Sequence, residues 1–286
     1  MPKHRSAISI GIAGIALAAA CVIATPAAAG NIFVSGHDSD FHAVNGGNAI
    51  GAQHIIQDAL SFVRNGSTAP ILFLQSDTSN IGLGDHTNSE TGLTNSGYAA
   101  GTSAGNFYVK HDATQFAADA AAGFAGYSAI FIPSDHGGTL TGNDLVMLDS
   151  APVTAAILAF VNGGGGLFAL AEDGTHTGPA APLFGFLPFL VTASPHGEFE
   201  GGNTLTADGL SLGLVNSDIN GNFSHNIFTA TGGMTVVDTD ATGEILSLMS
   251  RGTVTTGGVV PEPATIALFG LGALGLGLMR RVTKRA

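Results

Sequence analysis

Three short apolar runs most constrain the fold of this chain. Residues 71–74, 129–132 and 167–170 are apolar throughout, which is typical of strands covered on both faces of a sheet. Helical patterns lie between these runs, over residues 49–63, 113–124 and 141–161. Strand–helix–strand order predicts parallel strands. We therefore expect an α/β fold, a three-layer sandwich with a mostly parallel sheet.

The remaining elements complete a predicted body at residues 30–252. Further strands are expected at 31–35 and 107–109, followed by an antiparallel pair at 235–237 and 245–248. Glycine, serine, threonine and asparagine dominate residues 78–105, which predicts a long loop. Another loop is expected at 222–226. Residues 253–260 are predicted to be a linker.

The N-terminus has the pattern of a secretory signal. Lys3 and Arg5 precede an apolar run, and Ala27 to Ala29 supply small residues for cleavage. We predict a signal peptide at residues 1–29, removed by signal peptidase. The alternatives are a transmembrane helix and a lipoprotein anchored at Cys21. The apolar run is short for a span, and the residues before Cys21 fit a lipoprotein poorly.

The C-terminus has three parts: Pro261-Glu262-Pro263, an apolar run at 264–279, and a basic end with Arg280 and Arg281. A helix of this length spans about 24 Å at 1.5 Å per residue. That is shorter than the roughly 30 Å hydrocarbon core, and arginine snorkelling can reduce the difference. The alternative interpretation is an ordinary tail anchor.

This tail resembles the PEP-CTERM sorting signal, here predicted at residues 261–286. The resemblance implies a transient membrane anchor through the helix, with recognition and cleavage near the motif by an exosortase. It also implies a Gram-negative host that makes extracellular polysaccharide. We therefore expect export across the inner membrane, transient anchoring, and then a cell-surface or extracellular location.

Charge and cysteine content exclude several functions. Residues 30–261 contain 20 acidic and three basic residues, a net charge of −17 that disfavours nucleic-acid binding. Cys21 is the only cysteine. Cleavage of the signal peptide would therefore leave no disulfide, thiolate metal site or cysteine nucleophile.

Histidines and carboxylates follow the predicted strands, where open α/β sheets bind ligands. The candidate metal ligands are His37, Asp38, Asp135 and His136, and the candidate catalytic residues are Glu172 and His225. These residue types bind divalent metals and perform acid–base catalysis. Their spacing matches no metal motif, however, and loop turns and helix caps explain the same residues.

Residues 34–38, 131–135 and 164–170 resemble the class I glutamine amidotransferase-like fold, which is flavodoxin-like. The resemblance implies a cysteine nucleophile after the glycine-led strand, with His225 as a loose match to the late histidine. Ala171 or Glu172 occupies the nucleophile position here. The amidotransferase reaction is therefore not expected, because no thiol is present.

Two functional hypotheses follow. The first is an exported, exosortase-sorted, non-enzymatic component associated with exopolysaccharide or a biofilm matrix. The alternative is a secreted metal-assisted hydrolase or ligand-binding domain that uses the histidines and carboxylates at the strand ends. The missing nucleophile favours the first hypothesis.

Overall fold

The computed structural model describes residues 29–75, 88–135, 140–172, 182–187, 189–199, 201–255 and 258–260. The predicted signal peptide lies outside these residues except for Ala29, and the predicted helix at 264–279 lies wholly outside them.

The centre of the body is a parallel sheet. Its strands, in spatial order, are β3 (Ala99–Ala100), β4 (Phe107–His111), β2 (Ile71–Leu74), β5 (Ala129–Ile132), β6 (Gly166–Ala169) and β1 (Ile32–Ser35). All residues of β1, β2, β5 and β6 are buried. The apolar runs therefore form two-sided core strands, as the sequence predicts.

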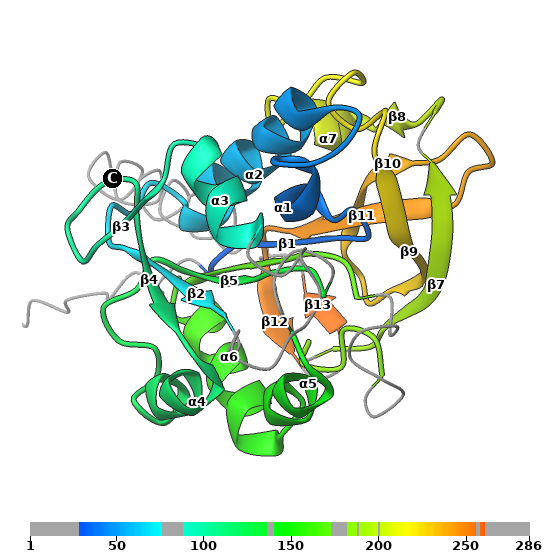
Figure 1. The fold of residues 1–286 in the computed structure, drawn as a ribbon. Coiled ribbons are helices and arrows are strands. Elements are labelled where there is room, and N and C mark those ends of the chain that lie inside the picture. The colour runs from blue at the N-terminus through cyan, green and yellow to red at the C-terminus, as the bar shows by residue number, and fades with distance from the viewer. Residues whose placement is uncertain are drawn as a thin grey trace, which may run out of the picture.

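Helices cover both faces of this sheet (Figure 1). One face carries α1 (Ser39–His42), α2 (Ala49–Arg64) and α3 (Asn88–Asn95), and the other carries α4 (Ala113–Ala121), α5 (Gly142–Leu148) and α6 (Ala151–Asn162). Thr141 caps α5 in a reciprocal box with Asp144, which confirms the predicted helix start. Two separate apolar clusters fill the spaces between the helices and the sheet. The three-layer α/β architecture is therefore present.

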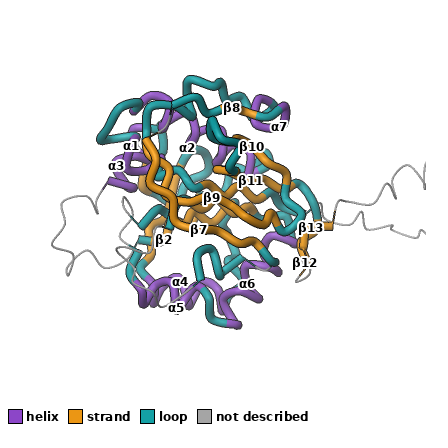
Figure 2. Tube along the Cα trace, turned by 90° about the vertical axis from the view of Figure 1, so that its right-hand side faces the viewer, coloured by secondary structure: helices purple, strands orange, loops and turns teal. Residues whose placement is uncertain are grey.

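Antiparallel strands extend the sheet beyond β1. There β11 (Ile245–Ser250) pairs with β1, and β10 (Thr235–Thr239) pairs with β11 and with β8 (Thr204–Leu205), which precedes α7 (Ala207–Leu210). The long strands β7 (Val191–Phe199) and β9 (Phe223–Thr231) pair with each other and run side by side (Figure 2). A single residue pair, Ile245 with Phe228, joins β9 to β11.

The strand order differs from the flavodoxin order 2-1-3-4-5. In that order the first strand lies between the second and third strands. Here β1 lies at the other side of the parallel group, between β6 and β11. The pattern reappears if β2 is taken as the first strand, β4 as the second, β5 as the third, β6 as the fourth and β1 as the fifth. The spatial order β4-β2-β5-β6-β1 then reads 2-1-3-4-5.

Three local predictions need correction. Helix α3 and strand β3 lie within the segment predicted as one long loop, because Leu93 packs into the core. The predicted loop at 222–226 overlaps β9, where His225 is a strand residue. The predicted linker contains a hairpin of β12 (Thr253–Thr255) and β13 (Gly258–Val260).

This hairpin packs against α6. The side chain of Asn162 donates to the carbonyl of Val254 at 2.8 Å and accepts from the Val254 amide at 2.9 Å. Val254 is 1% exposed and belongs to a core cluster. The packed body therefore extends beyond the predicted boundary at residue 252.

Candidate functional site

The ends of β1, β5 and β6 meet at one edge of the sheet, because these strands are parallel. Backbone hydrogen bonds join the segments that follow them. The Asp135 amide donates to the carbonyl oxygen of Ala171 at 3.0 Å, and the Ala171 amide donates to the carbonyl oxygen of His37 at 3.3 Å. Strand β9 joins this edge through the amide of His225, which donates to Gly36 at 2.7 Å.

The resulting group of polar residues is called the strand-end cluster. It comprises His37, Asp38, Asp40, His42, Ser134, Asp135, Glu172, His225 and Asp238.

Asp38 is the centre of this cluster. Its carboxylate lies 3.1 Å from Nε2 of His42 and 3.2 Å from Nε2 of His225, and the residue is 1% exposed. Burial alone would raise the pKa of Asp38, but the interactions with His225 and His42 lower it overall. Asp38 is therefore a buried carboxylate that stays ionised between two imidazoles.

Nε2 of His42 has two alternative hydrogen-bond partners, and it can bond to only one of them at a time. Its Nδ1 donates to the carbonyl of Asn45 at 2.9 Å, so a neutral ring can accept at Nε2 from the Phe223 amide at 3.2 Å. A protonated ring would instead donate from Nε2 to Asp38. Burial lowers the pKa of His42, but Asp38 outweighs this and raises it. Protonation of His42 therefore exchanges a backbone contact for an ion pair.

Asp40 ties the same edge to α3. Its carboxylate accepts from the Ser134 amide at 2.9 Å, from the Ser134 hydroxyl at 2.6 Å, and from the hydroxyl of Ser89. Burial raises the pKa of Asp40, and the charge of Asp38 adds to this increase. Asp40 is fully buried and its contacts are all within the protein, so its role here is to join elements.

His37 connects the cluster to the antiparallel extension. Its Nε2 lies 2.8 Å from a carboxylate oxygen of Asp238 on β10, and both side chains are buried. The hydroxyls of Ser35 and Ser247 pair at 2.9 Å beside it. The buried pair connects the segment after β1 to β10.

Glu172 is fully buried. Its amide donates to Asn226 at 2.7 Å, and its carboxylate accepts from the Phe184 amide at 2.8 Å. Burial raises the pKa of Glu172 to about 8, with contributions from Asp135 and Asp149. The side chain is therefore mostly protonated at neutral pH. It is fully buried, so a ligand cannot reach it in this conformation.

His225, whose side chain is 15% exposed, and Phe223, a residue 40% exposed, link the cluster to the surface. The Phe223 ring stacks against His42 and His225, with centroids 6.3 and 6.4 Å apart. An imidazole oriented by a carboxylate can transfer protons. The hydroxyl of the neighbouring Ser224 is buried, so it is not placed to attack a substrate.

The structure brings several predicted site residues together. His37, Asp38 and His225 share the strand-end cluster, and Asp135 and Glu172 are also there but fully buried. His136 lies outside the described residues. Asp40, His42 and Asp238 are not among the candidate ligands and catalytic residues predicted from the sequence. An acidic residue within an apolar strand was the available signal for Asp238.

Among the described residues, no single helix is long and apolar enough to cross a membrane. Only α5 and α6 taken together reach that length and hydropathy, and the pair is bent by 61°. Both helices contribute buried side chains to the core.

Comparison with known proteins gives one result. No curated protein and no solved structure matches the chain. The family model of the PEP-CTERM protein-sorting motif matches residues 259–281, which include the three-residue motif at Pro261 and the arginines Arg280 and Arg281. This motif implies an exported protein that undergoes a membrane-associated sorting step and is processed by an exosortase.

Proposed function

We propose that the chain is a non-enzymatic component of the cell surface or extracellular matrix, delivered there by exosortase sorting. The match to the PEP-CTERM motif at residues 259–281 carries this proposal. The buried state of the strand-end cluster supports it, because Asp38, Asp135 and Glu172 are at most 1% exposed. Their contacts hold the sheet together.

The proposed matrix partner is extracellular polysaccharide. A body with a net charge of −17 repels anionic polymers at low salt. The polymer in this proposal is therefore neutral, or is bridged to the protein by divalent cations.

We further propose that the body is class I glutamine amidotransferase-like in fold. The flavodoxin-like strand order counted from β2 supports this proposal. By that resemblance Ala171 or Glu172 stands at the nucleophile position, so no amidotransferase reaction is proposed.

The test is to follow the protein in its host with three forms of the chain. The full chain is expected at the surface in a shortened form. Deletion of residues 259–286 should send an unshortened body to the periplasm or medium. Replacing Pro261, Glu262 and Pro263 by alanine leaves the apolar run and the basic end in place, so this variant should remain in the membrane fraction unprocessed. Unchanged surface retention of the deleted form would contradict the proposal.

The second candidate function is metal-assisted hydrolysis or ligand binding at His225. The contact between His225 and Asp38 at 3.2 Å favours it, because a carboxylate orients an imidazole for proton transfer or metal binding. Metal analysis of the dialysed protein tests it. A stoichiometric ion that is lost in His225→Ala would support this second function, and an ion-free protein would remove its metal-assisted form.

A further inference from the structure

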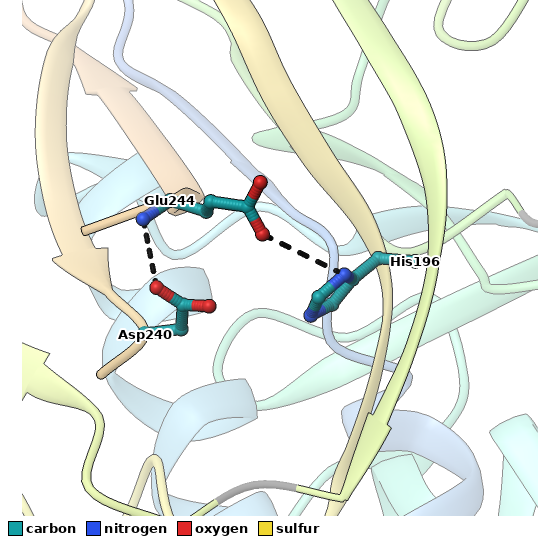
Figure 3. A group of neighbouring side chains, drawn as sticks. All are labelled: His196, Asp240 and Glu244. Atoms are coloured by element: carbon teal, nitrogen blue, oxygen red, sulfur yellow. Dashed lines mark hydrogen bonds and ion pairs between the residues drawn. The ribbon is translucent and has the colours of Figure 1, made fainter. Parts of the chain in front are cut away.

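A second group of potential ligands lies away from the strand-end cluster. His196 on β7 faces Asp240 and Glu244, which flank the turn between β10 and β11 (Figure 3). One ligand atom from each residue lies within 4.8 Å of the other two, and Nδ1 of His196 is 3.9 Å from Oε2 of Glu244. One imidazole and two carboxylates are a donor set for first-row divalent cations.

The turn holds the side chain of Asp240 and the backbone of Glu244 in place before any ion binds. Oδ1 of Asp240 accepts from the amides of Thr242 at 2.8 Å and Glu244 at 2.7 Å. The Asp240 amide donates to the carbonyl of Glu244 at 2.9 Å. Burial opposes ionisation of Asp240, but the hydrogen bonds from Glu244 and Thr242 together lower its pKa overall. Asp240 is therefore anionic at neutral pH and its position is fixed.

His196 supplies the independent observation. Its side chain is 11% exposed, and its Nε2 is buried without a hydrogen-bond partner. A buried polar atom without a partner is costly and rare in folded proteins. The nitrogen edge of the ring faces the space between the two carboxylates (Figure 3). The strand places it there through an irregularity between Pro195 and Glu198, where the register with β9 shifts.

We propose that His196, Asp240 and Glu244 bind a divalent cation, of which Zn²⁺ and Mn²⁺ fit the donors best. Tetrahedral bonds of 2.0–2.1 Å place ligand atoms about 3.4 Å apart. The present separations are slightly larger, and Glu244 is 47% exposed, so its side chain can swing inward. Water completes the coordination. The strongly negative body raises the local concentration of cations.

The ion would fasten β7 to the β10–β11 turn. In the part of the chain that the structure describes, β7 pairs with β9 and not with β11, and β9 pairs with β11 at Ile245 and Phe228. A cation shared by His196 and the turn adds a direct link across this weakly joined part of the sheet. Binding to the folded state alone stabilises it by mass action. This site is independent of the proposed surface function.

The test measures Zn²⁺ and Mn²⁺ binding to the full processed protein by titration calorimetry and by the shift in Tm. Wild type should bind one ion and gain thermal stability. His196→Gln and Glu244→Gln should each weaken binding more than about tenfold. The matched control is Asp208→Asn, which removes a half-exposed carboxylate away from this group and should leave binding unchanged.

The variants His225→Gln and Glu244→Gln make the result decisive. His225→Gln should bind the ion normally, which separates this site from the strand-end cluster. Glu244→Gln lies on a half-exposed turn and keeps the test available if His196→Gln fails to fold. Absence of binding in wild type would overturn the proposal. So would binding that survives both Glu244→Gln and His196→Gln but is lost in His225→Gln.

Discussion

The carboxylate of Asp38 lies 3.2 Å from Nε2 of His225, so a side chain in the segment after β1 contacts a side chain of the antiparallel strand β9. The same carboxylate holds His42 from α1. One buried charge therefore connects the parallel sheet, a short helix and the antiparallel extension.

Replacing this carboxylate should strongly destabilise the fold. Asp38→Asn leaves His42 and His225 without their anionic partner in a buried setting. Breaking such a pair from one side costs about 3–5 kcal/mol. Urea unfolding at neutral pH measures the change. Asp208→Asn is the control, because its pair with Arg251 is half exposed and should change stability by less than about 0.5 kcal/mol. Equal effects of the two substitutions would contradict the role of Asp38.

Glu172 should make the protein less stable as pH rises. Its pKa is about 8 in the folded state, compared with 4.5 in the unfolded chain. Between pH 4.5 and pH 8 the folded state therefore keeps a proton that the unfolded chain loses. Stability therefore falls from pH 4.5 to pH 8, by on the order of 4 kcal/mol from this group. Glu172→Gln should flatten the dependence. Urea unfolding at pH 5, 6.5 and 8 checks it, and parallel curves for the two proteins would refute it.

Gly36 should not accept a side chain. A Cβ at this position would lie 2.0 Å from the backbone carbonyl oxygen of Asn226, so β9 would have to move. Overpacking of this kind costs about 2–3 kcal/mol. Gly201→Ala is the matched control, since a Cβ there meets nothing within 4 Å and the backbone is unstrained. Thermal unfolding compares the two, and a harmless Gly36→Ala would show that β9 can shift.

Arg64 should resist replacement by lysine. Its guanidinium donates to Ser128, Asn106, Ala69 and Gly105, and the residue is 7% exposed. Lysine has fewer donors and a different geometry. We expect a loss of about 2–3 kcal/mol in urea unfolding, because hydrogen bonds to a buried charged group are lost.

The control for this substitution is Arg251→Lys. Arg251 is half exposed, lies 4.9 Å from the ring centroid of Phe62 and is 3.9 Å from Asp208. Its replacement should cost less than about 1 kcal/mol. If Arg64→Lys also lowered the free energy of unfolding by less than about 1 kcal/mol, the four hydrogen-bond contacts of Arg64 would contribute little to stability.

The sequence was a good guide where burial on two faces dictated composition. Strands β2, β5 and β6 and helices α2, α5 and α6 follow from uninterrupted apolar runs, helical periodicity and the cap at Thr141. It failed where tertiary pairing decides structure. Strands β7 and β9 have mixed compositions, so their own sequences do not predict a strand. Pairing with each other stabilises them.

The site was predictable in outline only. The rule that parallel strands end at one edge correctly brought together the residues after β1, β5 and β6. It could not predict the degree of burial, which separates Glu172 from the partly exposed His225. Asp238 and His196 were missed because their contacts depend on the register of antiparallel strands far along the chain.

The hairpin of β12 and β13 affects when the sorting tail can be processed. Val260 ends β13 and also lies within the matched sorting motif, and Pro261 follows it directly. We therefore expect folding of the hairpin and processing near the motif to compete for neighbouring residues. We expect a newly exported chain to be cut fastest before this hairpin closes. After closure, the release rate would follow the opening of two short strands held to α6 by Asn162.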